Sequence, residues 1–117
     1  MKETGNVIVD LSFKFALDII AFAEILEQER KYIIANQLLK SGTSIGGANI
    51  REVQNGESKQ DFIHKLKIAA KEADETEYWL LLCENSENYP FNSQLLEDIK
   101  ILQKIINKII GTAKSKG

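Results

Sequence analysis

Hydrophobic residues recur at alternating steps of four and three along most of this chain, which is the spacing of one face of an α-helix. The pattern is clearest over residues 59–86, where a single apolar stripe continues for three heptads. Its members are Phe62, Leu66, Ala69, Ala73, Thr76, Leu80 and Cys83. A sustained seven-residue repeat predicts helices that pack in a left-handed bundle, with axes crossing at about 20°.

Three further segments show the same spacing and predict helices over about 11–28, 31–54 and 94–112. Their stripes are Phe15, Ile19, Phe22 and Leu26, then Ile34, Leu38, Ser41 and Ile45, then Leu95, Ile99, Leu102, Ile106 and Ile109. The only run typical of a strand is the isolated Val-Ile-Val at 7–9. We therefore expect an all-α protein: a single domain, 1–117, folded as an antiparallel up-down-up-down four-helix bundle.

Polar residues at the segment ends predict where the helices begin and stop. Asp10 is the candidate N-cap of the first helix, because its carboxylate can accept a free backbone N–H. Asn55-Gly56 is expected to end the second helix and Ser58 to cap the third. Pro90 interrupts the chain before the fourth helix, for which Asn92 or Ser93 is the candidate cap.

Three glycines interrupt the second predicted helix: Gly42, Gly46 and Gly47. Each lowers helix stability by roughly 1 kcal/mol relative to alanine. A helix that tolerates this either packs closely against a neighbour there or kinks there. Close packing is the interpretation that we favour.

The helices also carry more large apolar residues than a monomeric bundle needs. The surplus lies on the first and fourth helices and comprises Leu17, Ile20, Ile25, Ile101, Ile105 and Ile110. Left exposed, these side chains would form a patch that monomers rarely tolerate. We therefore expect self-association, with Leu17, Ile20, Ile101 and Ile105 as the candidate interface.

The net charge of −2 is distributed unevenly. Residues 91–117 hold five lysines against two acids, for a net +3, whereas residues 1–90 carry −5. Lys100, Lys104 and Lys108 fall on one row of the fourth helix, and Lys114 would extend it. Two interpretations stay open: a solvated helix face, or a ridge that contacts the phosphates of RNA or DNA.

No set of residues in the sequence has the spacing of a catalytic or metal site. The only histidine, His64, and the only cysteine, Cys83, point about 100° apart on one helix, and no Glu-x-x-His metal motif is present. We expect no enzyme activity, no metal or cofactor and no small-molecule substrate. The lone cysteine and the absence of a long apolar run favour a cytoplasmic protein without membrane association.

Three stretches resemble a known family: QLLKSGTSIGGANIRE at 37–52, NGESKQDFIHKLKIA at 55–69, and ETEYWL at 75–80. The chain resembles the four-helix-bundle family of S23 ribosomal proteins, encoded in intervening sequences of 23S rRNA genes. That family includes the accessory variability determinant of diversity-generating retroelements, and these relatives are basic and are thought to bind nucleic acid and a reverse transcriptase. The resemblance implies a homopentameric ring with no known catalytic activity.

Together these observations favour a non-enzymatic oligomeric scaffold or adaptor. The alternative is a nucleic-acid-binding accessory protein that uses the basic face of its fourth helix. The expected partners are further copies of the chain, and RNA, DNA or a protein that processes nucleic acid.

Overall fold

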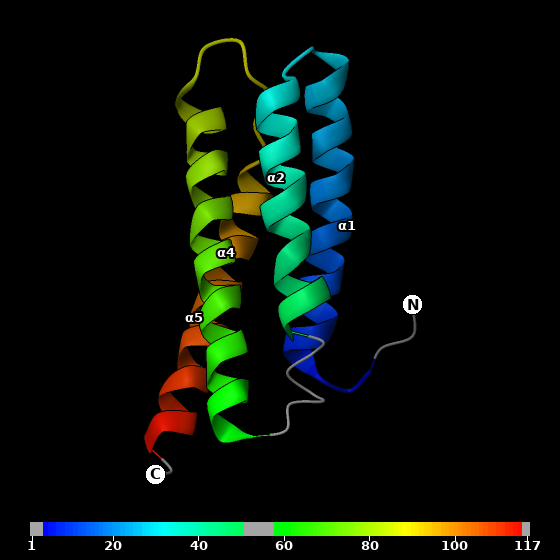
Figure 1. The fold of residues 1–117 in the computed structure, drawn as a ribbon. Helices are drawn as coiled ribbons and strands as arrows, with labels where there is room; N and C mark the ends of the chain where they lie inside the picture. Colours follow the sequence, from blue (N-terminus) through cyan, green and yellow to red (C-terminus); the bar gives the residue numbers. More distant parts are fainter. Residues whose placement is uncertain (1–3, 51–57, 116–117) are drawn as a thin grey trace.

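The computed structural model describes residues 4–50 and 58–115, apart from the side chains of Ala48 and Asn49. These residues form α1 (Val7–Gln28), α2 (Tyr32–Ser44), the π-helical segment η1 (Ile45–Ile50), α4 (Lys59–Asn85) and α5 (Ser93–Ser115). The helices run alternately up and down (Figure 1), and no strand occurs in the described residues. The predicted all-α, antiparallel four-helix bundle is confirmed.

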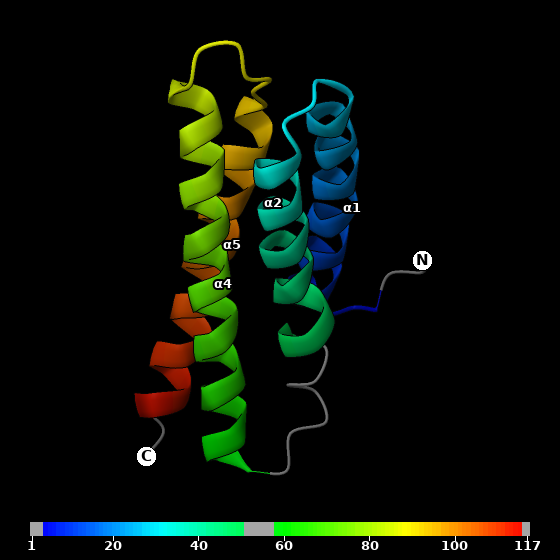
Figure 2. The ribbon, with the colours of Figure 1, turned by 45° about the horizontal axis from the view of Figure 1, so that its top comes forward.

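Each helix lies at one corner of an elongated bundle measuring 49 × 28 × 20 Å. α1 packs against α2 and α5, and α4 also packs against α2 and α5, as Figures 1 and 2 show from two directions. The two helical hairpins, α1–α2 and α4–α5, are closely packed, whereas α1 and α5 meet less closely. Within the described residues, no helix is both long and apolar enough to cross a membrane.

The apolar stripes read from the sequence form the core. Leu38 of α2, Leu80 of α4 and Ile99 of α5 are fully buried, each from a different helix. The heptad stripe of α4 is buried from Leu66 to Cys83, with Phe62 partly buried at its lower end. The observed periodicity therefore places the same residues inward that the sequence selects.

The beginning of α1 differs from the prediction. Asn6, not Asp10, is the N-cap: its side-chain oxygen accepts the backbone N–H of Val9 at 3.4 Å. Asp10 lies inside the first turn and accepts the Thr4 hydroxyl at 2.9 Å. The assignment of Asp10 was wrong because Ile8 and Val9 are buried, and this burial outweighs the modest helix propensity of the β-branched run.

The other helix ends follow the sequence more closely. Ser58 caps α4 as predicted, since its hydroxyl accepts the Asp61 N–H at 3.1 Å. Asn92 caps α5, because its side-chain oxygen accepts the N–H groups of Gln94 at 3.0 Å and Leu95 at 3.3 Å. α5 continues to Ser115, three residues past the predicted end. The predicted Asn55-Gly56 turn lies outside the described residues.

Two of the three glycines allow α1 and α2 to approach closely. A methyl group added at Gly42 would lie 2.9 Å from a side-chain carbon of Ile19, and one added at Gly46 would lie 2.8 Å from the Ser12 hydroxyl oxygen. Gly47 has nothing within 4 Å of the same position. Close packing is therefore confirmed for Gly42 and Gly46, and the backbone in addition widens into η1 from Ile45 onward.

Candidate functional site

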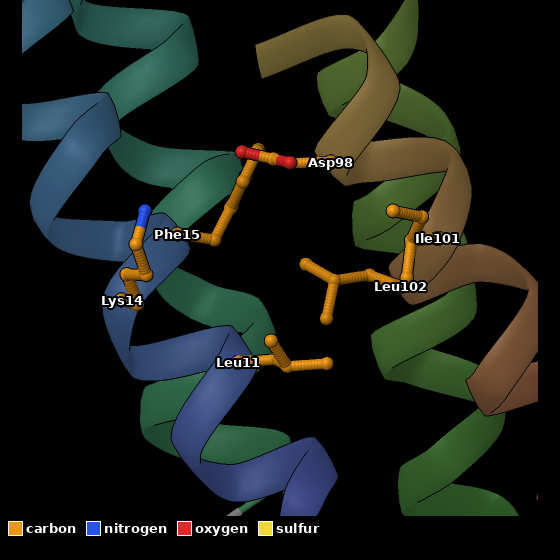
Figure 3. A pocket seen from close by; sticks show the side chains of 6 residues that line it. All are labelled: Leu11, Lys14, Phe15, Asp98, Ile101 and Leu102. Carbon is orange, nitrogen blue, oxygen red and sulfur yellow. The ribbon is translucent and has the colours of Figure 1, made fainter. Parts of the chain in front are cut away.

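A groove lies between α1 and α5, where these helices pack less closely. Leu11 and Phe15 of α1 and Ile101 and Leu102 of α5 line a space of about 160 Å³, with Lys14 and Asp98 also lining it. In Figure 3, Leu11 and Leu102 extend into the space between the two ribbons. The space is about the size of one large apolar side chain. We call these six residues the groove surface.

The charged rim of the groove is neutralised within the chain. Lys14 Nζ lies 2.7 Å from Asp18 Oδ2, one turn further along α1. The hydrogen bond to Asp18, and then its negative charge, raise the pKa of Lys14, with a smaller contribution from Asp98. The lysine therefore stays protonated, and the groove presents an apolar floor beside a paired charge.

The four residues predicted to form one interface occupy different places. Ile101 is 49% exposed at the groove surface, whereas Ile105 is partly buried and packs against the core. Leu17 and Ile20 are 52% and 39% exposed. Ile20 lies nine positions after Leu11, which turns the helix by about 900°, or half way round after whole turns are removed; Leu17 lies six positions after Leu11, which places it about 120° round.

Leu17 and Ile20 therefore point away from the groove. We call these two residues the outer surface of α1. The structure separates the predicted interface into two apolar surfaces, one at the groove between α1 and α5 and one on the outer side of α1. The groove surface also includes Leu11, whose exposed fraction of 36% was not anticipated from the sequence. Leu11 lies four residues before Phe15, in line with the core stripe, so the sequence gave no signal that α5 would leave it uncovered.

The lysine row of α5 is exposed along its length. Lys100, Lys104 and Lys108 all lie at the surface, and none of the three forms an ion pair in the described part of the chain. Lys114 does not continue this row. Repulsion by the positive charge of Lys67 on α4 is the largest of the causes that lower the pKa of Lys114.

Lys67 was not among the sequence candidates. The signal that could have found it is the register of an antiparallel hairpin, in which residues whose numbers have a constant sum face each other. The same register brings Gln103 of α5 to Asp74 and Glu77 of α4, whose carboxylates accept its amide N–H groups at 3.0 and 3.2 Å. Toward the C-terminal half of α4, the α4–α5 seam is therefore acidic, and its acids already accept hydrogen bonds. Toward the N-terminal half of α4, the seam is basic.

The groups that could serve catalysis are poorly placed for it. Burial raises the pKa of the Cys83 thiol to about 11, which suppresses its reactive thiolate, and His64 is exposed. Glu72 is partly buried, and its pKa is raised chiefly by burial and then by the charge of Glu75. The described residues contain no group of three His, Cys, Asp or Glu side chains placed to hold a metal ion.

The sequence offers Glu52, Glu72 and Glu75 as acids that could pair with Arg51, Lys71 or backbone donors of another helix, and of these Arg51 and Glu52 lie outside the described residues. Trp79, two turns further along α4, is partly buried, and its indole Nε1 is enclosed without a hydrogen-bond partner in the described part of the protein. Its ring meets that of Tyr78 edge to face, with centroids 5.3 Å apart.

Comparisons with known proteins give a consistent result. A family model described as 23S rRNA-intervening sequence protein matches residues 5–110. A crystal structure of a protein of unknown function from the S23 ribosomal protein family of Bacteroides thetaiotaomicron is 42% identical to this chain, with a TM-score of 0.82. The similarity covers 88% of this chain and 97% of that one. No curated protein matches.

Proposed function

This chain belongs to the 23S rRNA-intervening sequence protein family, and from that premise we propose that it is a non-enzymatic scaffold that acts as a homo-oligomer. The observation that carries the proposal is the pair of exposed apolar surfaces, one at the α1–α5 groove and one on the outer side of α1. Monomeric proteins seldom leave such surfaces open, and a second copy is the partner that every molecule of this chain meets. The single buried thiol suits a scaffold that works in the cytoplasm.

Two different surfaces on one protomer favour a head-to-tail assembly. In such an interface, the groove surface of one copy receives the outer surface of α1 from the next, rather than the same patch meeting itself. When the rotation between copies closes, the product is a ring. Five copies is the ring size that the resemblance implies.

Complementation between two interface variants tests the head-to-tail arrangement. Leu17→Lys should disable the outer surface, and Ile101→Lys the groove surface, so each variant alone should sediment as a monomer. Mixed in equal amounts, the two variants retain one intact pair of surfaces and should form a heterodimer that cannot grow further. Sedimentation velocity measures all three samples at the same micromolar concentration.

Ile33→Lys is the matched control. Ile33 is 78% exposed on α2, outside both surfaces, so this variant should assemble as the unmodified chain does. A monomeric unmodified chain would contradict the scaffold proposal. If Leu17→Lys and Ile101→Lys both remained fully assembled, the interface would lie elsewhere. If both were monomers and their mixture formed no heterodimer, the head-to-tail arrangement would be ruled out.

A second candidate function is nucleic-acid binding through Lys100, Lys104 and Lys108. The observation that favours it is the exposed row of three positive charges, one per helical turn, which form no ion pair with the described residues and lie on a helix with no acid after Asp98. Replacing all three lysines with glutamate should abolish binding to single-stranded RNA in a titration against salt. Absence of binding by the unmodified chain at low salt would exclude this candidate.

A further inference from the structure

A second apolar space lies further along α5 than the groove surface. It measures about 390 Å³ and is lined by Phe62 of α4 and by Lys108, Ile109, Thr112 and Ala113 of α5. α5 extends past the point where α1 begins (Figure 1), so this part of α5 has no α1 beside it. One stripe of α5 joins the two spaces, at steps of three, four, four and three: Asp98, Ile101, Ile105, Ile109 and Thr112.

α1 carries a stripe of the same form on its outer side. Phe13, which is partly exposed, lies one turn before Leu17, and Ile20 follows. Asp10 and Glu24 continue this stripe at its two ends. Each stripe therefore has three apolar residues at its centre and a polar residue at each end, a spacing that suits knobs-into-holes packing between two helices. We call the two sets the α1 stripe (Phe13, Leu17, Ile20) and the α5 stripe (Ile101, Ile105, Ile109).

We propose that the α1 stripe of one copy packs antiparallel along the α5 stripe of the next, with Leu17 opposite Ile105 and Phe13 opposite Ile109. Ile20 then enters the groove surface beside Ile101. This pairing rests on the scaffold proposal and deepens it, because it names the two helices that meet, their relative direction and their register.

The sizes of the two spaces favour this direction. Phe13 enters the larger space, of about 390 Å³, and Ile20 enters the smaller one, of about 160 Å³. Ile101 and Ile109 are about 12 Å apart along α5, and Phe13 and Ile20 are about 10.5 Å apart along α1, so both side chains can be seated at once. The same direction keeps the helices of every copy aligned, as a head-to-tail ring around the long axis of the bundle requires.

The polar ends of the stripes fix the register. A shift of one heptad in either direction would bring Asp10 or Glu24 against Ile105 and bury a carboxylate among apolar side chains. In the proposed register, Asp10 comes opposite Thr112, where Lys108 supplies a positive charge beside the larger space. Glu24 comes opposite Asp98 at the other end, where Lys14 lines the same groove.

Disulfide cross-linking between the polar ends of the stripes tests the direction and the register. Asp10→Cys combined with Thr112→Cys, and Glu24→Cys combined with Asp98→Cys, should each form chains of cross-linked copies on oxidation with diamide. Exchanging the partners gives matched controls, Asp10→Cys with Asp98→Cys and Glu24→Cys with Thr112→Cys, which would cross-link only if the helices met in the opposite direction. The native Cys83 is buried, and the unmodified chain oxidised in parallel controls for it.

A substitution at Phe13 provides a second measurement that needs no cysteine. Phe13→Asp should weaken self-association at least about tenfold in sedimentation, because it places a charge in the larger apolar space. Tyr32→Asp is the matched control, since Tyr32 is 56% exposed on α2, outside both stripes. The control should change self-association by less than about twofold, and circular dichroism should show both variants folded.

The possible results separate the stripe pairing from the scaffold proposal on which it rests. If the unmodified chain is a monomer, both fail. If it assembles but the exchanged cysteine pairs cross-link as well as the matched pairs or better, the pairing is overturned and the scaffold survives. Assembly of Phe13→Asp equal to that of the unmodified chain would also overturn the pairing. Cross-linking by the two matched pairs alone, together with weakened assembly of Phe13→Asp, supports the proposal.

Discussion

Ser41 of α2 and Thr76 of α4 meet inside the core with their hydroxyl oxygens 2.9 Å apart. Thr76 Oγ1 also lies 2.8 Å from the carbonyl oxygen of Glu72, one turn back. Thr76 has a single hydroxyl hydrogen, so when this hydrogen goes to the carbonyl, Ser41 is the donor between the helices. This polar link between α2 and α4 in the core is therefore satisfied at both ends.

Thr76→Val should destabilise the protein by about 1–3 kcal/mol, because valine keeps the shape of threonine but leaves the buried Ser41 hydroxyl without its partner. Ser41→Ala combined with Thr76→Val should cost less than the sum of the two single changes. Urea unfolding of the four proteins at one fixed protein concentration measures this coupling. Strict additivity would show that the two hydroxyls do not depend on each other.

Gly42→Ala should destabilise the protein by about 1–3 kcal/mol, because the new methyl group would lie 2.9 Å from Ile19 within closely packed helices. Gly47→Ala is the matched control, since nothing lies within 4 Å of its added methyl group. That change should be neutral or stabilise by up to about 1 kcal/mol by restricting the unfolded chain. Thermal unfolding compares the two, and equal effects would argue against close packing at Gly42.

Cys83 should resist thiol reagents in the folded protein. Its side chain is 1% exposed, and with a pKa of about 11 only about 0.1% of the thiol is ionised at pH 8. A disulfide reagent such as Ellman's should react at the rate of global or local opening, and fully once urea has unfolded the chain. Rapid labelling of the folded protein would contradict the buried position.

Glu72→Gln should make stability less dependent on pH. The raised pKa of Glu72 means that the folded state holds this proton more tightly than the unfolded chain does. Its favourable contribution is therefore complete below the ordinary pKa of 4.5 and is lost as the pH rises through the higher, folded value.

Glutamine imitates the protonated acid, so the variant should be more stable than the unmodified protein at pH 7, and the difference should shrink toward pH 4. Because much of the side chain is solvated, we expect only a few tenths of a kcal/mol at pH 7. Glu84→Gln, which removes an exposed acid from the same helix, is the control for net charge. If the stability difference between Glu72→Gln and the unmodified protein grew as the pH fell from 7 toward 4, the expected direction of the effect would be contradicted.

Periodicity was sufficient to predict the bundle, because burial in a four-helix protein follows the same steps of three and four that the sequence displays. It was insufficient at the start of α1, where Ile8 and Val9 are held in the helix by contacts with distant residues rather than by their own preference. It also gave no sign of η1, because steps of three and four assume α-helical geometry, and Gly46-Gly47 permits a wider turn.

The candidate surfaces were predictable only in part. Exposure of Leu17, Ile20 and Ile101 follows from their positions beside the core stripe, but Ile110 is buried because α5 presents a wider apolar face than one seam. The separation of these residues into two flanks depends on which neighbour lies on each side of α1. The repulsion that Lys67 exerts on Lys114 likewise depends on the register between two helices, which no single helix reveals.

Trp79 gives the protein an intrinsic optical probe. It is the only tryptophan, and its indole N–H is enclosed away from water on α4, beside Tyr78. Its fluorescence should therefore be emitted at short wavelength while the bundle is intact and shift to the red when α4 is released. Unfolding of this protein can therefore be followed without attaching a dye.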